Sequence, residues 1–245
     1  MSENTKITEK MDNTNNTEKT VETNKKGNET TNKKGNETTN KKKEPDTFFI
    51  VPYRDRQQHL ELFCNHMERI LEDINYEILV IHQCDTRYFN RGAMKNIGFR
   101  FIKDKYPNTY KNKTLVFHDV DHVVWGKNVF DWKTTEGKIV HNYGFPRKIA
   151  ASLGGIFTIK ANDFEKTNGF PNYWAWGYED NALYWRAKKL NFNISHPLRT
   201  LRDKDIILFW HGQTRLTNEA YIWKNFNNDD NIGLKEISDL KYTTK

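Results

Sequence analysis

The sequence predicts a single α/β domain with a mostly parallel central sheet flanked by helices, and three observations support this prediction. Apolar runs typical of strands alternate with stretches whose apolar residues recur at helical spacing. The chain has 245 residues, of which 36% are hydrophobic and 13% aromatic, so it can bury the core of one domain of roughly 200 residues. The composition also changes abruptly at Thr47, where the apolar residues become frequent.

The first 46 residues are predicted to be a disordered, low-complexity tail. Their hydrophobic side chains are Met1, Ile7, Met11 and Val21. Four such side chains are too few to offset the entropy cost of ordering the segment. Residues 23–30 recur at once as residues 31–38, which is a short repeat of polar residues and not a solenoid. The predicted organisation is therefore a tail at residues 1–46, read most simply as a solvated spacer, and a folded domain at residues 47–245.

Strands and helices alternate in the first part of the predicted domain. Strands are expected at residues 48–51, closed by Pro52, and at residues 76–81 and 115–117, with helices at residues 60–71 and 90–101. The order strand, helix, strand, helix, strand is typical of a parallel sheet covered by helices. Ligands of such sheets bind at the carboxyl ends of the strands, so the residues that follow these strands are expected to lie near one another.

The formal net charge of +7 lies mainly on the predicted domain. The tail holds ten Lys against nine Asp and Glu, which leaves +6 for the rest of the chain. A moderately basic domain suits an anionic ligand such as a nucleotide diphosphate. Nucleic acid is not an expected partner, although a polyanion binder that uses the lysine-rich tail stays open as an alternative.

Cysteine usage and hydropathy give an expectation about location. Cys64 and Cys84 could form at most one bridge, which favours reduced thiols. No apolar run approaches the roughly 18 to 20 residues that span a bilayer, and the N-terminus shows no apolar leader. We expect a soluble protein, located in the cytoplasm, without a transmembrane segment.

Two aspartates directly follow the predicted strand at residues 115–117. In an extended turn the carboxylates of Asp119 and Asp121 can face one pocket while Val120 faces the other way. Two carboxylates beside a diphosphate suit a hard divalent cation, Mg²⁺ or Mn²⁺. A solvated turn is the alternative, because turns favour Asp.

A histidine follows a predicted strand further along the chain. The apolar residues 206–210 lead to His211, and a histidine ligand beside carboxylates would favour Mn²⁺ over Mg²⁺. A histidine that only caps the strand is the alternative.

An unusual aromatic segment spans residues 168–180. Aromatic rings stack on the apolar faces of sugars, and neighbouring Gly and Asn residues allow such a loop to act as a lid. Glu179 and Asp180 place carboxylates beside the rings, where one could act as general base on an acceptor hydroxyl. The alternative is a core-packing loop that ends in a helix N-terminus at Glu179 and Asp180, where acidic residues favour the helix dipole.

Five motifs occur in order and together resemble one family. They are residues 52–60 (Pro-Tyr-Arg-Asp-Arg-Gln-Gln-His-Leu), residues 89–92 (Phe-Asn-Arg-Gly), residues 117–121 (Phe-His-Asp-Val-Asp), Gly154-Gly155 and residues 168–180. This series is similar to that of the β-1,4-galactosyltransferase family and covers residues 47 to about 215. The resemblance implies a GT-A type Rossmann-like fold and an inverting transfer from a UDP-sugar with Mn²⁺ as cofactor.

The resemblance also implies roles for individual residues. The motif matched to the uridine and phosphates comprises Tyr53, Arg54 and Arg56, joined by Phe89, Arg91, Asp119 and Val120. Asp121 and His211 match the metal-binding aspartate and histidine. Trp176 matches the tryptophan that closes over the donor, Asp180 matches the catalytic base, and Glu179 is its neighbour in the acceptor site.

Three departures from the family pattern affect specificity. Asn181 and Ala182 stand where further carboxylates usually follow the base. Ser152, two residues before Gly154 and next to Gly155 in the expected donor site, replaces a tyrosine that crowds C2 of the sugar, so UDP-GalNAc and UDP-GlcNAc compete with UDP-Gal as donor. Leu208 occupies a position that holds a metal ligand in many members, and Leu cannot coordinate a metal.

The resulting prediction is a UDP-sugar-dependent glycosyltransferase that transfers a hexose or an N-acetylhexosamine to a hydroxyl of a glycan or glycoconjugate. The alternative is a nucleotide-sugar or glycan binding protein with little or no turnover, suggested by Asn181, Ala182 and Leu208.

Overall fold

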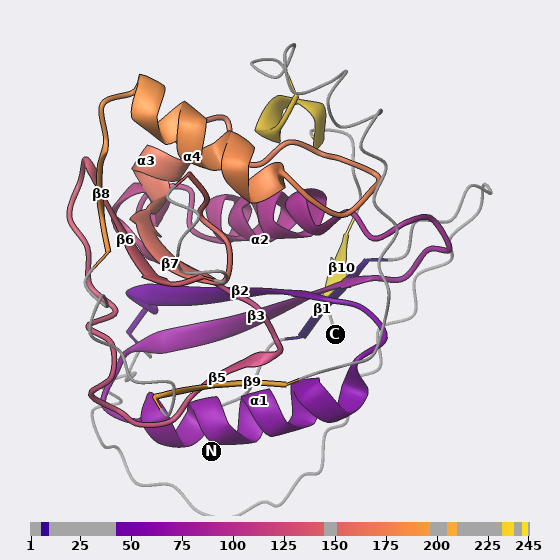
Figure 1. Ribbon diagram of the computed structural model, residues 1–245, viewed down its shortest axis with the longest axis vertical. Helices are drawn as coiled ribbons and strands as arrows, with labels where there is room; N and C mark the ends of the chain where they lie inside the picture. Colours follow the sequence, from indigo (N-terminus) through magenta and orange to yellow (C-terminus); the bar gives the residue numbers. More distant parts are fainter. Residues whose placement is uncertain are drawn as a thin grey trace, which may run out of the picture.

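The computed structural model describes residues 6–9, 43–144, 151–196, 205–209, 232–237 and 242–244. Within these ranges eight strands form one sheet in the order β10-β1-β3-β2-β4-β7-β6-β8. Helices cover both faces of this sheet, so the molecule has three layers (Figure 1). The predicted α/β class is confirmed, with a sheet that is mainly parallel on one side and mainly antiparallel on the other.

The parallel part holds the strands that the sequence predicts. They are β2 (Thr47–Tyr53), β3 (Tyr76–Gln83) and β4 (Thr114–His118), with β2 in the middle. β2 does not end before Pro52 as expected, because Pro52 still pairs with Ile81 of β3. On its other side β2 pairs with β4 only as far as Ile50, so the missing N–H of Pro52 removes no bond of that ladder.

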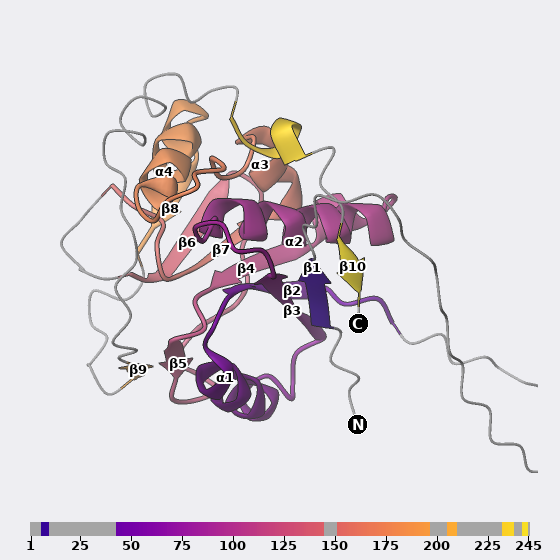
Figure 2. The ribbon, with the colours of Figure 1, turned by 90° about the vertical axis from the view of Figure 1, so that its right-hand side faces the viewer.

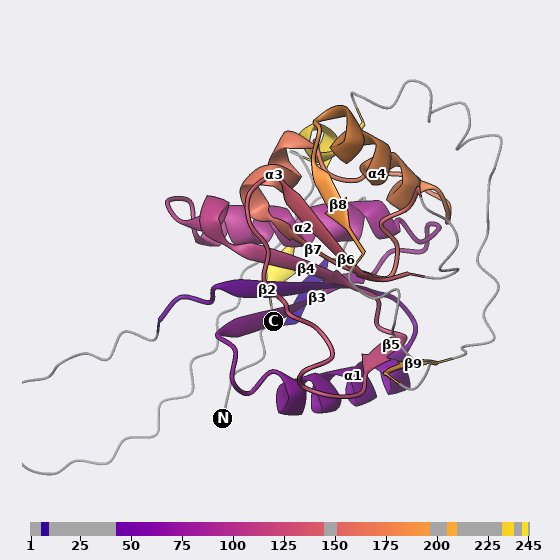
Figure 3. The ribbon, with the colours of Figure 1, turned by 60° about the vertical axis from the view of Figure 1, so that its left-hand side comes forward.

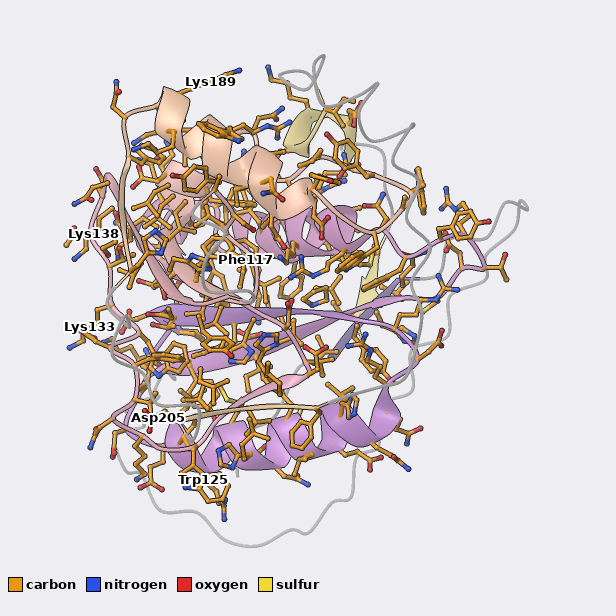
Figure 4. All side chains as sticks on the ribbon, viewed as in Figure 1. Phe117, Trp125, Lys133, Lys138, Lys189 and Asp205 are labelled. Carbon is orange, nitrogen blue, oxygen red and sulfur yellow. The ribbon has the colours of Figure 1, made fainter. Side chains whose placement is uncertain are left out.

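The second part of the sheet reverses direction at β4. β7 (Ile156–Lys160) runs antiparallel to β4, and β6 (Lys138–Tyr143) runs antiparallel to β7. β8 (Asn193–Ser195) closes this edge parallel to β6. The aromatic ring of Phe117 in β4 stacks on that of Phe157 in β7 at 4.9 Å, in the centre of the molecule (Figure 4).

Among the described residues, one helix covers the first face of the sheet and three cover the other. α1 (Gln57–Ile70) packs against the alternate side chains of β2 that include Phe49 and Val51. α2 (Arg91–Lys105), α3 (Ala161–Lys166) and α4 (Glu179–Lys189) lie on the opposite side, where Phe48 and Ile50 point. Figure 2 shows α1 below the sheet and the other three helices above it.

Two short strands form a separate small sheet beside α1. β5 (His122–Val124) follows the Asp119-Val120-Asp121 turn directly and pairs antiparallel with β9 (Ile206–Leu208). This pairing, visible at the α1 end of the molecule in Figure 3, brings the chain near residue 208 beside the turn. Trp125 and Asp205 continue it through a backbone hydrogen bond of 2.9 Å.

Short elements complete the described structure. The 3₁₀ turns η1 (Tyr110–Asn112) and η3 (Leu234–Ile237) lie on the α2 side, and β10 (Thr243–Thr244) pairs with β1 (Lys6–Glu9) at the sheet edge. β1 lies beside β3 in parallel, although composition assigns these four residues to the tail. Disorder of the remaining tail stays a prediction, because residues 10–42 lie outside the described ranges. Across those ranges, every helix is too short or too polar to cross a bilayer.

Candidate active site

The residues singled out from sequence gather where the parallel strands end. β2 ends at Tyr53, directly before Arg54 and Arg56, and β4 ends one residue before Asp119. After β3 the chain makes a short loop to Asn90, whose side-chain oxygen accepts a hydrogen bond from the backbone N–H of Ala93 at 2.9 Å and so caps α2. These three strand ends form one edge of the sheet, which is the expected ligand-binding edge of an α/β fold.

The Asp119-Val120-Asp121 turn divides its side chains as the sequence predicts. Val120 is 4% exposed and packs in the core on the α1 side, so its side chain faces away from the site. Asp119 and Asp121 are partly exposed, and each meets an arginine. The predicted nucleotide contact of Val120 could therefore come only from its backbone.

Arg91 at the start of α2 connects three carboxylates. Its Nη2 lies 2.5 Å from Oδ1 of Asp119, and its Nη1 lies 2.7 Å from Oε1 of Glu179 and 2.5 Å from Oδ2 of Asp180. Burial lowers the pKa of Arg91, but the three carboxylates outweigh that effect and raise it well above its ordinary value. The guanidinium thus holds the end of β4 and the start of α4 together with a permanent positive charge.

Asp180 lies at the centre of this buried charge network. Besides Arg91, it contacts Lys95, whose Nζ donates to Oδ1 of Asp180 at 2.9 Å. Burial by itself raises the pKa of Asp180. The charges of Arg91 and Lys95 lower it by more, so the pKa lies below the ordinary value of 3.8. Asp180 is therefore ionised at neutral pH and is able to accept a proton.

Asp121 faces a second set of partners. Its Oδ2 lies 2.6 Å from Nη1 of Arg56, and its Oδ1 lies 2.8 Å from Nδ1 of His122. Burial raises its pKa, but the hydrogen bond and charge of His122, together with Arg56, lower it more strongly, so the carboxylate is ionised. Asp119, Asp121 and His122 offer ligand atoms that all lie within 4.8 Å of one another.

His122 is a site residue that the sequence reasoning missed. The available signal was its position directly after Asp121, where an imidazole stands next to a carboxylate pair. His122 also pairs with Leu208 across β5 and β9, and neighbouring residues of an antiparallel pair carry their side chains on the same face. The other predicted ligand, His211, lies outside the described residues.

The remaining residues of the first motif border the same edge. Tyr53 is buried and meets His82 of β3 edge to face at 4.9 Å, and burial raises its pKa. Arg54 donates to Asp55 at 3.1 Å and to the backbone carbonyl of Arg87. Phe89 is partly buried against the core on the α2 side.

Ser152 and the two glycines lie beside Asp180. A Cβ placed on Gly154 would stand 3.0 Å from Oδ2 of Asp180 and 3.5 Å from Oγ of Ser152. Gly155 has a φ of +78°, and a Cβ there would meet the carbonyl oxygen of Tyr143 at 2.3 Å. Glycine is thus required at residue 155 by the backbone, and a side chain at residue 154 would crowd Asp180.

The aromatic segment ends in the helix start that one of the two interpretations predicts, while its action as a lid stays a prediction. α4 does begin at Glu179, after Tyr178 in the left-handed conformation, and Oε2 of Glu179 accepts from the N–H of Gly177 at 3.1 Å. The same residue also contacts Arg91, so the helix start is part of the charge network. Trp176 is 47% exposed, and Trp174 receives the guanidinium of Arg87 at 3.7 Å from its ring.

Fold and site together define a GT-A type glycosyltransferase scaffold, and comparison with known proteins supports this class. The family model described as the N-terminal region of glycosyl transferase group 7 matches residues 2–130, and that described as the N-terminal domain of galactosyltransferase matches residues 137–207. The chain belongs to this galactosyltransferase family, glycosyl transferase group 7. The family predicted from the five motifs is therefore confirmed.

Curated relatives share about a third of their residues with the chain over the matched part. β-1,4-galactosyltransferase 4 of Homo sapiens is 32% identical over 159 residues, which cover 61% of the chain and 44% of the relative. β-1,4-galactosyltransferase 1 of Bos taurus is 31% identical over 156 residues, which cover 60% and 38%. The chain therefore spans less than half the length of these relatives.

Solved structures confirm the fold. The catalytic domain of Drosophila β1,4-galactosyltransferase 7, in complex with xylobiose, superposes with a TM-score of 0.65 at 24% identity, covering 77% of this chain and 82% of that one. A mutant of the same Drosophila enzyme, in complex with manganese, UDP-Gal and xylobiose, gives a TM-score of 0.67 with the same identity and coverage. The predicted GT-A type fold is confirmed.

Proposed function

We propose that this chain is an inverting, metal-dependent glycosyltransferase that moves a hexose or an N-acetylhexosamine from a UDP-sugar to a hydroxyl of a glycan or glycoconjugate. The observation that carries the proposal is the contact of Arg91 with both Asp119 and Asp180. Through this contact one guanidinium joins the residue matched to the nucleotide and the residue matched to the base. Membership of the galactosyltransferase family supports the reaction class.

The chemistry requires one base and one way to stabilise the leaving diphosphate. The acceptor hydroxyl gives its proton to Asp180 as its oxygen forms a bond to the anomeric carbon, and the bond from that carbon to the diphosphate oxygen breaks with its electron pair. Asp180 is ionised and partly accessible, as a general base must be. Since the attack is a single displacement, no covalent nucleophile is needed.

Arg56 and Arg91 supply positive charge for the diphosphate. The Arg56 side chain is only 7% exposed, and among the described residues its buried Nε has no hydrogen-bond partner. A buried donor without a partner is costly, and an incoming phosphate oxygen would satisfy it.

The residues beside the turn fit a divalent cation. Asp121 and His122, with Asp119 close by, offer carboxylate and imidazole ligands within one another's reach. This mixed ligand set favours Mn²⁺ over Mg²⁺. When bound, the cation supplies charge that neutralises the departing diphosphate. The Drosophila structure with manganese and UDP-Gal supports this choice of cofactor and donor.

A donor screen with Mn²⁺, read by release of UDP, tests the proposal. Wild type is expected to release UDP with at least one UDP-sugar and acceptor, and Asp180→Asn is expected to lose activity by a factor of about a hundred to ten thousand while it still binds the donor. Asp104→Asn, an exposed change on α2, is the matched control and should retain activity. Loss of donor binding in Asp180→Asn would indicate a structural role for Asp180.

The donor sugar is tested at Ser152. Because Oγ of Ser152 and Oδ2 of Asp180 both lie close to Gly154, Ser152→Tyr is expected to shift preference from UDP-GalNAc toward UDP-Gal. An unchanged donor preference would show that Ser152 does not face the sugar.

A binding protein without turnover is the second candidate. Asn181 donates to the backbone carbonyl of Ala151 at 2.8 Å, so it serves the local structure where a further carboxylate would serve an acceptor. Saturable UDP-sugar binding without UDP release across an acceptor panel would favour this candidate. A cytoplasmic location stays a prediction.

A further inference from the structure

Lys95 is a buried lysine that has no role in the reaction proposed above. It lies one turn after Arg91 on α2 and is 0% exposed. Its Nζ lies 4.4 Å from the centre of the Phe170 ring and 2.9 Å from Oδ1 of Asp180. An ammonium group is expensive to bury, so its place beside this particular carboxylate requires an explanation.

The two oxygens of Asp180 have different surroundings. Oδ1 points to Lys95 in the interior. Oδ2 contacts Arg91 at 2.5 Å and faces Gly154, where a Cβ would stand 3.0 Å from Oδ2 and 3.5 Å from Oγ of Ser152. Oδ2 is thus the oxygen on the side of Gly154 and Ser152, where the donor sugar is expected.

We propose that Lys95 is a positioning residue for Asp180, holding Oδ1 so that Oδ2 is presented to the acceptor hydroxyl. This inference rests on the proposed function. The proton of the hydroxyl passes to Oδ2, while Lys95 keeps its own protons and its bond to Oδ1. When a phosphate draws Arg91 away, Lys95 is the cation that keeps the carboxylate in place.

The other charged groups around Asp180 do not duplicate this contact. Arg91 also contacts Asp119 and Glu179, so its guanidinium is shared among three carboxylates. Glu179 repels Asp180 from the same helix, and His141 of β6 binds the carbonyl of Gly154 at 2.8 Å. The one hydrogen bond described for the Lys95 ammonium goes to Asp180. Burial and the charge of Arg91 lower the pKa of Lys95, while Asp180 counteracts them.

The test compares Lys95→Met, which removes the charge at similar length, with Lys95→Gln, which keeps an N–H donor. Lys103→Met, two turns further along α2 on its exposed side, is the matched control. In Lys95→Met we expect kcat to fall by up to about a hundredfold, the scale of a misplaced reacting group, with KM for the UDP-sugar unchanged. Lys95→Met removes a positive charge beside Asp180, so the pKa of Asp180 rises. As the pH is lowered, the variant should therefore lose activity at a higher pH than wild type does. Lys95→Gln should retain more kcat with the same displacement of the acid side.

A merely structural lysine gives a different result. If Lys95→Met has a lower melting temperature but the wild-type kcat and a pH profile that superimposes on wild type, the positioning role is overturned. Wild type that releases no UDP from any donor refutes the proposed function itself, which is a separate outcome. Should neither single variant fold, the double variant Lys95→Met/Asp180→Asn decides: recovery of folding supports action through Asp180, and continued failure indicates packing alone.

Discussion

Helices α1 and α2 pack on opposite faces of the same strands, yet they are built differently. α1 buries Phe63, His66, Met67 and Ile70 and exposes most of its other side. α2 buries eleven of its fifteen residues, including Arg91, Lys95 and Asn96. α1 therefore covers the sheet with one apolar stripe, whereas α2 is enclosed between the sheet and α4.

The difference shows where function has been built into the fold. The apolar stripe of α1 stabilises the sheet, and this stabilisation is enough to explain it. The buried charges in the first turns of α2 are costly by themselves and become tolerable only because three carboxylates face them. Apolar residues would fill the same space without this cost in stability. The buried charges of α2 therefore indicate a functional site.

The largest expected effect comes from removing the shared cation of α2. Arg91→Met leaves Asp119, Glu179 and Asp180 facing one another without their guanidinium, and we expect a loss of about 3–5 kcal/mol in the free energy of unfolding. Binding of the UDP-sugar should be lost as well. Chemical denaturation and calorimetric titration with UDP measure the two effects.

The matched change on α1 is Arg69→Met, an exposed arginine that contacts His66. It should leave both stability and UDP affinity near wild type. If Arg91→Met kept its affinity for UDP, Arg91 would not belong to the donor site. The proposed difference between α1 and α2 would then be wrong.

A core truncation on α1 should separate stability from function. Met67 is fully buried on the apolar stripe, so Met67→Ala is expected to cost on the order of 3 kcal/mol through lost contacts and a cavity. The folded fraction should bind Mn²⁺ and UDP with wild-type affinity, because Met67 packs in the core on the α1 side of the sheet and offers no ligand for either. Weakened binding, measured well below the melting temperature, would show that α1 does more than cover the sheet.

This contrast also explains what the sequence could predict. α1 was found from helical spacing because only one of its faces is apolar, although it begins at Gln57 and not at Leu60. α2 was placed one residue from its true start, but its burial on all sides hides the periodicity that would reveal which residues face a site. The strands of the second part of the sheet, β6, β7 and β8, were not predicted, because their pairing depends on contacts between distant segments.

The site was predictable as a set of residues and not as a network. Strand ends placed Arg56, Asp119 and Asp121 at one edge, as the structure shows. The contact of Lys95 with Asp180 joins α2 to α4 across 85 positions of sequence, and no local pattern encodes such a pairing. His122 could have been found locally, and its role as a ligand remains a prediction.

The smallest expected effect lies at the far end of α2, on the same helix but outside the site. Nζ of Lys103 lies 2.6 Å from Oε1 of Glu165 on α3, and both side chains are partly exposed. A double-mutant cycle with Lys103→Met and Glu165→Gln should give a coupling of about 0.2–1 kcal/mol, as exposed ion pairs do. UDP release should stay unchanged in all three variants.

The pH dependence of this coupling follows from the two pKa shifts. Burial raises the pKa of Glu165, but hydrogen bonds from Lys103 and Tyr110 lower it below its ordinary value of 4.5 overall, so the contribution is present above that pH and is lost as the pH falls through the folded value. The hydrogen bond to Glu165 raises the pKa of Lys103 above 10.5, so its contribution is present below that pH and is lost as the pH rises through the folded value. The coupling should therefore be constant from about pH 5 to about pH 10. A coupling of several kcal/mol would mean that the charges of α2 stabilise the fold along the whole length of the helix. Arg91 and Lys95 at its amino end would then not differ from its exposed charges.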